Sequence, residues 1–306
     1  MPIIEAKNLK KYFGNVKAVD DISFTVEKGE LFGFLGVNGA GKSTTINMLA
    51  TLLPATEGQV LICDHELGKD NEKIRQNIGI VWQQNALDDF LTVEENLLCR
   101  GYLYEKEISK NKGNLKKVTE LLSLEDVLRR RYGKLSGGQK RRCEIAAALM
   151  HTPKILFLDE PTTGLDPATR QSVWDAVARL QNEDNVTVFL TTHYMEEAAM
   201  ANHIVLLNSG KIVDCDTPFA LKERYAHDML RLQPLNMGAI NEISQKLQHL
   251  RLPYSEKEGR ILVPLSATME ALPVLSQVKE LIDGFEVVQG TMDDVFLNAC
   301  GKELVS

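Results

Sequence analysis

The 306-residue sequence lacks several features, and each absence narrows its function. It has no apolar run of about 18 residues, which excludes a membrane-spanning helix from the sequence. Its five cysteines are scattered without a C-x-x-C pair, which argues against a zinc site or a disulfide framework. Lys and Arg number 35 against 42 Asp and Glu, so a basic coat for nucleic acid is not expected. We therefore expect an acidic, cytoplasmic protein that binds neither zinc nor nucleic acid.

The sequence has enough apolar residues for a sizeable core, since 44% are hydrophobic and 25% are charged. Strands are predicted at 31–35, 78–82, 155–158, 187–191 and 204–207, and helices at 42–52, 169–182 and 195–201. Several of the strands are continuously apolar, which is typical of parallel strands buried on both faces. The pattern predicts an α/β core over residues 1–225, with a helical subdomain at about 92–150.

The pattern changes after residue 225, and residues 226–306 are predicted to form a small α+β domain. Strands are expected at 229–233, 260–265 and 285–289, and helices at 239–250, 268–282 and 292–300. A regulatory or dimer-bracing role and a passive stabilising role are both open for this domain.

Residues 36–43 read Gly-Val-Asn-Gly-Ala-Gly-Lys-Ser and match the phosphate-binding pattern G-x-x-x-x-G-K-[ST]. The glycines let backbone N–H groups turn toward an anion, and the following helix N-terminus adds positive potential. Lys42 can then reach the β- and γ-phosphates, and the Ser43 hydroxyl can bind Mg²⁺. This loop occurs in kinases, GTPases, helicases and transport ATPases. A GTPase is disfavoured, because the nearest N-K-x-D match, at 111–114, lacks the Asp.

Two acids end the apolar run 155–158, namely Asp159 and Glu160. Beside a phosphate loop, Asp159 is a candidate Mg²⁺ ligand and Glu160 a candidate base for the attacking water. His193 follows the strand 187–191 and should emerge at the same sheet edge, where it could contact a γ-phosphate. The alternatives are solvated acids at a strand end and a structural histidine.

The segment 135–139, Leu-Ser-Gly-Gly-Gln, precedes another helical pattern. Two glycines at a helix start suggest a second anion-binding surface, although an ordinary helix-starting turn is the alternative.

Together these motifs resemble the nucleotide-binding subunits of ATP-binding-cassette (ABC) transporters over residues 3–225. The motifs come in the family's order. They are the aromatic A-loop (Phe13 or Tyr12), Walker A (36–44), the Q-loop (Gln83), the LSGGQ signature (135–139), Walker B with its glutamate (155–160), the D-loop (164–166) and the switch histidine (His193). Three shorter segments, 84–89, 141–145 and 292–297, resemble the daunorubicin-resistance type of exporter ATPase.

The resemblance implies a P-loop NTPase fold of the ABC ATPase type, with a mixed sheet, and ATP and Mg²⁺ as ligands. The implied catalytic residues are Lys42, Gln83, Glu160 and His193, and the implied metal ligands are Ser43, Gln83 and Asp159. The implied nucleotide-binding residues are Tyr12, Phe13, Gly36, Asn38, Gly39, Ala40, Gly41, Lys42, Ser43, Thr44, Ser136, Gly137, Gly138, Gln139 and Asp166.

The resemblance also implies two partners. A second ATPase subunit, expected to be a second copy, would complete each ATP site with its signature segment. An integral membrane permease would dock near residues 84–105 and hold the chain at the inner face of the membrane. The expected function is to power export of a drug, lipid, peptide or polysaccharide. The alternative is a non-transport ABC ATPase that regulates a membrane sensor or acts as a cytosolic binding module.

Overall fold

The computed structural model describes residues 2–301, apart from the side chains of residues 183 and 184. The chain divides into two compact units, residues 1–217 and 218–306. The division falls before the expected boundary at 225/226, because α8 (Pro218–Tyr225) packs against α11 (Met292–Cys300) in the second unit. Residues 302–306 of the expected C-terminal domain lie outside the described residues.

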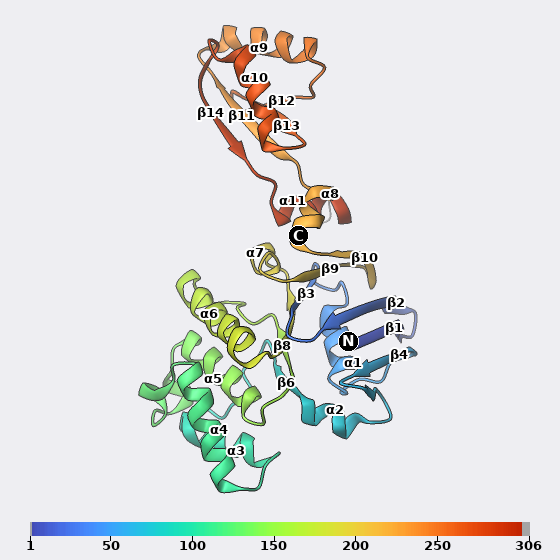
Figure 1. The fold of residues 1–306 in the computed structure, drawn as a ribbon, viewed down its shortest axis with the longest axis vertical. Helices are drawn as coiled ribbons and strands as arrows, with labels where there is room; N and C mark the ends of the chain where they lie inside the picture. The colour runs from blue at the N-terminus through green and yellow to red at the C-terminus, as the bar shows by residue number, and fades with distance from the viewer. Residues whose placement is uncertain (1, 302–306) are drawn as a thin grey trace. The chain divides into compact units, whose positions relative to one another are not determined.

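The main sheet of the first unit has six strands in the order β10-β9-β3-β8-β7-β6 (Figure 1). Their bounds are β3 (Leu31–Leu35), β6 (Ile78–Val81), β7 (Ile155–Asp159), β8 (Thr187–Thr192), β9 (His203–Asn208) and β10 (Lys211–Asp216). All pairs are parallel except β9–β10. Since β3, β7 and β8 are buried along their whole lengths, the residues that follow their carboxyl ends meet at one edge.

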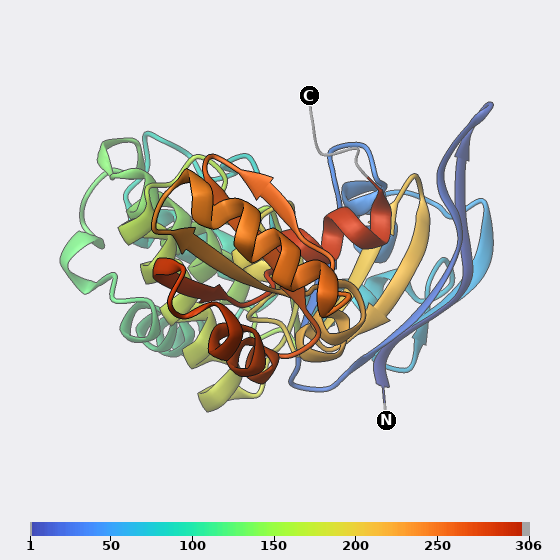
Figure 2. The same ribbon diagram turned by 90° about the horizontal axis from the view of Figure 1, so that it is seen from above.

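A second, antiparallel sheet has the order β2-β1-β4-β5, and the sequence patterns did not predict its strands. Their bounds are β1 (Pro2–Phe13), β2 (Val16–Glu27), β4 (Glu57–Ile62) and β5 (His65–Glu66). Figure 2 shows β1 and β2, in blue, as long strands lying side by side. Register shifts interrupt their pairing at several points. Such bulges break the alternation of apolar and polar residues that identifies a strand in a sequence.

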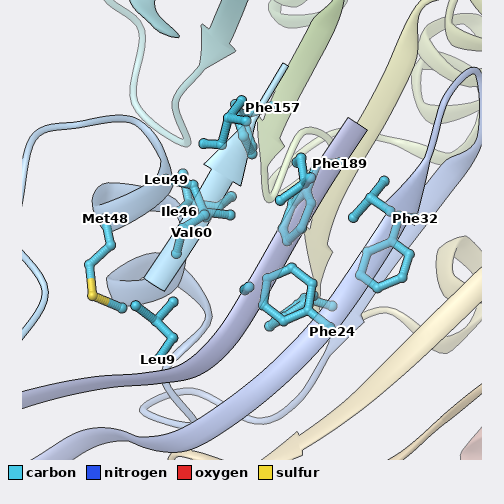
Figure 3. Close-up of a cluster of buried hydrophobic side chains, with 14 of the residues drawn as sticks. Leu9, Phe24, Phe32, Ile46, Met48, Leu49, Val60, Phe157 and Phe189 are labelled. Atoms are coloured by element: carbon cyan, nitrogen blue, oxygen red, sulfur yellow. The ribbon is translucent and has the colours of Figure 1, made fainter. Parts of the chain in front are cut away.

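One hydrophobic core joins both sheets to α1 (Lys42–Leu49). Figure 3 shows Phe24, Phe32 and Phe189 facing one another. The ring centroids of these three side chains are 5.6–6.1 Å apart. Ile46 and Leu49 of α1 are fully buried in the same cluster. The two elements that flank the phosphate loop, β3 and α1, are therefore both anchored in the core.

Helices surround the main sheet. Their bounds are α2 (Asn71–Asn77), α3 (Val93–Tyr102), α4 (Ile108–Leu121), α5 (Gly137–Leu149), α6 (Pro167–Asp184) and α7 (Met195–Ala198). α3, α4 and α5 pack on one another and occupy the span of the expected helical subdomain (Figure 1). α1 ends earlier than the predicted 42–52, because Thr51 takes a left-handed conformation with φ 64°. α7 is also shorter than predicted. No helix in the described part of the chain has the length and apolarity needed to cross a membrane.

The second unit contains a four-stranded antiparallel sheet in the order β12-β13-β11-β14. Its βαββαβ elements are β11 (Asp228–Pro234), α9 (Met237–His249), β12 (Ser255–Lys257), β13 (Arg260–Leu265), α10 (Ala271–Val278) and β14 (Ile282–Val288). Buried side chains of β11 and β13 pack against α9 and α10. The predicted helix 268–282 is confirmed over 268–278, as a short 3-10 helix followed by α10, but its end is wrong, because α10 ends at Val278 and Ile282 already pairs with Pro234.

Candidate active site

The phosphate loop connects β3 to α1, and two of its glycines are required by their surroundings. A Cβ on Gly36 would lie 2.5 Å from the Leu207 carbonyl oxygen. Gly41 has φ +109°, and a Cβ there would lie 2.5 Å from the Ala18 carbonyl oxygen. Any side chain at either position would displace the loop from its neighbours. The loop backbone is thus held in one shape, with the N-terminus of α1 behind it.

Lys42 is the first residue of α1, and only 4% of it is exposed. Its Nζ donates to the Gly36 carbonyl at 2.7 Å and lies 3.5 Å from Glu160 Oε1. Burial lowers the pKa of the Lys42 ammonium, and the Glu160 carboxylate opposes that shift. A buried ammonium group is suited to bind an anionic group.

Asp159 ends β7 and is also buried, with 7% of it exposed. Its Oδ1 accepts hydrogen bonds from Thr191 Oγ1 at 2.5 Å and from Ser43 Oγ at 3.3 Å. Thr191 lies directly opposite Asp159 in the β7–β8 pairing. The sheet therefore fixes the Asp159 carboxylate beside the Ser43 hydroxyl in the first turn of α1.

Glu160 follows Asp159 in a left-handed conformation, with φ 46°. A non-glycine residue in this region is strained, and such strain is common at functional sites. Its Oε2 accepts hydrogen bonds from Thr163 Oγ1 at 3.2 Å and Gln83 Nε2 at 3.3 Å. Both donors orient the carboxylate, and Gln83 reaches it from the loop after β6.

His193 follows β8 and faces the same carboxylate. Its Nδ1 lies 3.3 Å from Glu160 Oε2. This nitrogen is buried and has no hydrogen-bond partner within residues 2–301. An unpaired buried polar atom is uncommon in folded proteins and points to a ligand or a water at this position.

These groups surround a cleft of about 500 Å³. Its walls are Ala18, Asn38, Gly39, Gly41, Lys42, Ser43, Thr44, Gln83, Glu160, Thr163 and His193. The structure thus brings together the phosphate loop, the acids after β7 and the histidine after β8. Ser43, Asp159 and Gln83 offer hydroxyl, carboxylate and amide oxygens, which are the donor types that Mg²⁺ prefers.

The signature segment lies elsewhere, at the start of α5. The Ser136 side chain caps the helix by accepting from the Gln139 backbone N–H, and Gln139 Oε1 accepts from the Ser136 N–H. A Cβ on Gly138 would lie 2.4 Å from Thr169 Cγ2, so this segment packs closely on the start of α6. Asp166 caps α6, and hydrogen bonds from Thr169 lower the pKa of its carboxyl group. Neither segment lines the cleft of its own subunit.

The aromatic pair at the end of β1 is also outside the cleft walls. Half of Phe13 is exposed, and Lys11 Nζ lies 5.0 Å from its ring centroid. The Tyr12 hydroxyl donates to Asp20 Oδ1 at 2.6 Å, which fixes that ring to β2. Phe13 therefore has the more accessible ring face for a flat ligand.

Sequence reasoning missed three side chains of the site, namely Ala18, Thr163 and Thr191. Thr163 and Ala18 line the cleft, and Thr191 holds Asp159. A signal existed for Thr191, because it ends an apolar run next to the candidate histidine. Its partner could not be known without the register of β7 and β8.

Known proteins are similar to this chain in sequence and in fold. The model of the ABC transporter family matches residues 19–163. The linearmycin resistance ATP-binding protein LnrL of Bacillus subtilis is 35% identical over 313 residues, which covers 99% of each chain. The chain belongs to the ABC transporter family. The daunorubicin/doxorubicin resistance ATP-binding protein DrrA of Streptomyces peucetius is 35% identical, over 97% of this ABC subunit and 92% of the relative. The Nod factor export ATP-binding protein I of a Rhizobium species is 34% identical, over 98% of each.

Solved ABC structures give the same fold. A dimeric, post-hydrolysis state of the ATP-binding cassette MJ0796, bound to ADP and Pi, covers 70% of this chain and 98% of its own. Its TM-score is 0.63 and its identity is 28%. The cbiO1 subunit from Clostridium perfringens, part of the transporter complex cbiONQ, has a TM-score of 0.67 and 25% identity, over 82% of this chain and 96% of its own. This ABC subunit is therefore an ATPase, which binds ATP and hydrolyses it to drive transport.

Proposed function

We propose that this ABC subunit powers an exporter by hydrolysing ATP in the cleft between the phosphate loop and Glu160. The supporting observation is the meeting of Lys42, Asp159 and Glu160 at one edge of the main sheet, with Lys42 Nζ 3.5 Å from Glu160 Oε1. Phosphoryl transfer needs charge stabilisation and an oriented nucleophile, and this edge offers groups for both.

In this proposal, the loop backbone and Lys42 bind the phosphates of ATP. Ser43, Asp159 and Gln83 would hold Mg²⁺, which neutralises charge on the β- and γ-phosphates when it is bound. The more exposed Phe13 ring stacks on the adenine, with Tyr12 held away by Asp20. Neither ring lines the cleft, so the proposal that Phe13 stacks on adenine is supported only by the exposure of its ring.

Glu160 is the proposed base for the attacking water. Its carboxylate is oriented by Gln83 and Thr163, and its backbone N–H donates to the Thr191 carbonyl at 3.0 Å. His193 would contact the γ-phosphate with its imidazole, whose Nδ1 lies 3.3 Å from Glu160 Oε2 but makes no hydrogen bond within the described residues. The positions of Glu160 and His193 support both roles, because both residues line the cleft.

The signature residues Ser136, Gly137, Gly138 and Gln139, together with Asp166, are proposed to face the nucleotide of a second copy. Two observations support this. They do not line the cleft of their own subunit, and a related cassette, MJ0796, is dimeric in its ADP- and Pi-bound state. The working unit would then be a head-to-tail pair of subunits with two ATP molecules between them.

A separate integral membrane permease is the proposed partner of that pair, and it would hold the ATPase at the inner face of the membrane. A cleft of about 240 Å³ lies between the core and the helical subdomain, and Trp82, Ala86, Arg100 and Tyr104 help to line it. It overlaps the segment 84–105 where docking was expected. The exposed Leu52 side chain borders the same cleft and adds apolar surface for a permease helix.

The proposed cargo is an antibiotic-type small molecule. Two relatives that align over nearly the full chain support this class, since they are named for resistance to linearmycin and for resistance to daunorubicin and doxorubicin. The second unit is proposed to regulate the ATPase or to brace the dimer, because it has a core of its own. Truncation after Thr217 with unchanged ATPase and unchanged export would contradict the proposal for this unit.

The test of the ATPase assignment is the variant Glu160→Gln. It should bind ATP with wild-type affinity but release phosphate about 10²–10⁴-fold more slowly, the scale of a positioned base. Glu196→Gln, the same change at an exposed carboxylate on α7, is the matched control. Wild-type turnover by Glu160→Gln would contradict the assignment of the base.

Lys42→Ala should instead weaken ATP binding, and an unchanged affinity would remove Lys42 from the phosphate site.

The exporter assignment needs a separate test in cells. A strain without this gene should become more sensitive to at least one antibiotic in a panel, and the wild-type gene should restore resistance. The Glu160→Gln gene should fail to restore it. Equal sensitivity of all strains across the panel would contradict the proposed cargo class.

A further inference from the structure

A stack of three side chains joins the start of α6 to His193. The guanidinium carbon of Arg170 lies 4.3 Å from the centre of the Tyr194 ring. The Tyr194 and His193 rings are 4.1 Å apart at their centres, with 38° between their planes. Arg170 Nε also donates to the Leu165 carbonyl at 3.1 Å. One continuous set of contacts therefore runs from the segment before Asp166 to the histidine of the cleft.

The backbone at both ends of this stack is fixed by other groups. Glu197 is almost fully buried, and its carboxylate accepts hydrogen bonds from the hydroxyls of Thr162 and Thr192. The Tyr194 N–H donates to Thr192 Oγ1 at 2.9 Å. These bonds set the course of the chain after β7 and β8 without any contribution from Arg170. The contacts among Arg170, Tyr194 and His193 are therefore not needed to fix the backbone, and they can instead orient the His193 side chain.

The His193 ring needs such a support. Its Nδ1 has no hydrogen-bond partner within residues 2–301, so no hydrogen bond at that nitrogen fixes the ring plane. Contact with an aromatic neighbour stabilises a defined ring orientation, and the Arg170 guanidinium over the Tyr194 ring holds that neighbour. Arg170 and Tyr194 themselves do not line the cleft.

We infer that Arg170 and Tyr194 are positioning residues that hold the His193 imidazole in its orientation toward Glu160. They also tie that orientation to the segment 165–166 at the start of α6. The inference rests on the proposed role of His193. Small errors in the position of a reacting group slow turnover strongly, up to about 10²-fold for a shift near 1 Å. Loss of the stack should therefore lower kcat and leave nucleotide binding almost unchanged.

The experiment measures kcat and KM for ATP, and the affinity for ATP, with the full-length chain. Tyr194→Leu and Arg170→Gln should each lower kcat about tenfold, with the ATP affinity changed by less than about twofold. Tyr194→Phe keeps the ring face and should recover most of the wild-type kcat. Arg179→Gln, the same change at an exposed arginine of α6, is the matched control. Wild-type kcat in both Tyr194→Leu and Arg170→Gln would overturn the inference.

A double-mutant comparison separates positioning from a general structural role. If Tyr194 acts through His193, then Tyr194→Leu should slow the wild-type protein but cause no further loss in the His193→Ala background. An equal loss in both backgrounds, or a loss that Tyr194→Phe does not recover, would overturn the inference. A wild-type rate for His193→Ala would instead overturn the proposed role of His193, and the inference with it. The two failures are thus distinguishable.

Discussion

Ser43 Oγ and Asp159 Oδ1 lie 3.3 Å apart, although 116 positions separate the two residues in the sequence. The contact joins the first turn of α1 to the end of β7. Both elements are anchored in the same hydrophobic core, α1 by its buried residues Ile46 and Leu49 and β7 by burial along its whole length. The rigid core therefore sets the spacing of two oxygen donors that suit a divalent cation.

Asp159→Asn should raise the Mg²⁺ concentration needed for half-maximal ATPase activity by at least about tenfold. The amide keeps the shape of the side chain but removes the negative charge that favours the cation. Titration of ATPase activity with Mg²⁺ at saturating ATP measures the effect. Asp175→Asn, at an exposed carboxylate on α6, is the control. An unchanged Mg²⁺ requirement would remove Asp159 from the metal site.

The meeting of the motifs at one cleft could be predicted, because they follow apolar runs that are easily recognised. The phosphate loop follows 31–35, the two acids follow 155–158, and His193 comes after 187–191, and all three runs lie in buried strands. A parallel sheet brings such carboxyl ends to one edge, so their proximity follows from the fold class. The residue types, and their positions after predicted strands, were sufficient to predict that the phosphate loop, the two acids and His193 lie close together.

The contacts that orient those groups could not be predicted. The hydrogen bond from Thr191 to Asp159 depends on the register of β7 and β8, which is a tertiary property. The stack of Arg170 on Tyr194 likewise depends on how α6 packs beside β8. The strand β14 was predicted partly as helix, because pairing with β11 overrides the local pattern at Ile282.

Glu197→Ala should lower the free energy of unfolding by about 2–4 kcal/mol. The carboxylate is 3% exposed and accepts from Thr162 and Thr192, so its removal leaves two buried hydroxyls without an acceptor. Urea denaturation followed by circular dichroism measures the change. Glu196→Ala, one position earlier and exposed, should stay within about 0.5 kcal/mol of wild type. Equal stability of the two variants would contradict a structural role for the Glu197 hydrogen bonds.

The stability of the first unit should fall as the pH falls below about 6.5, in part through His151. Burial lowers the pKa of this imidazole below its ordinary value of 6.5. The unfolded chain then binds more protons than the folded chain between the two pKa values, so protonation favours unfolding in that window. One such group changes the unfolding free energy by at most about 1.4 kcal/mol per pH unit.

His151→Gln tests this contribution. Glutamine can still donate to the Ile78 carbonyl, which His151 Nε2 contacts at 2.9 Å, but it does not titrate. Urea denaturation at pH 7.5 and pH 5.5 should show a smaller loss of stability for the variant than for the wild type. His249→Gln, at an exposed histidine of the second unit, is the control, and it should lose as much stability between pH 7.5 and pH 5.5 as the wild type does. Identical pH dependence in the wild type and in His151→Gln would contradict the prediction.

Leu52→Glu should weaken association with the permease without impairing the ATPase of the free subunit. Leu52 is 62% exposed and borders the cleft between the core and the helical subdomain, so the change costs little folding energy. A charge there must be desolvated when an apolar helix docks, which opposes binding. Co-purification of tagged permease with each variant, together with ATPase assays of the free subunit, measures both effects. Leu61→Glu, at an exposed leucine of β4 outside this cleft, is the control. Equal recovery of the permease with both variants would place the docking surface elsewhere.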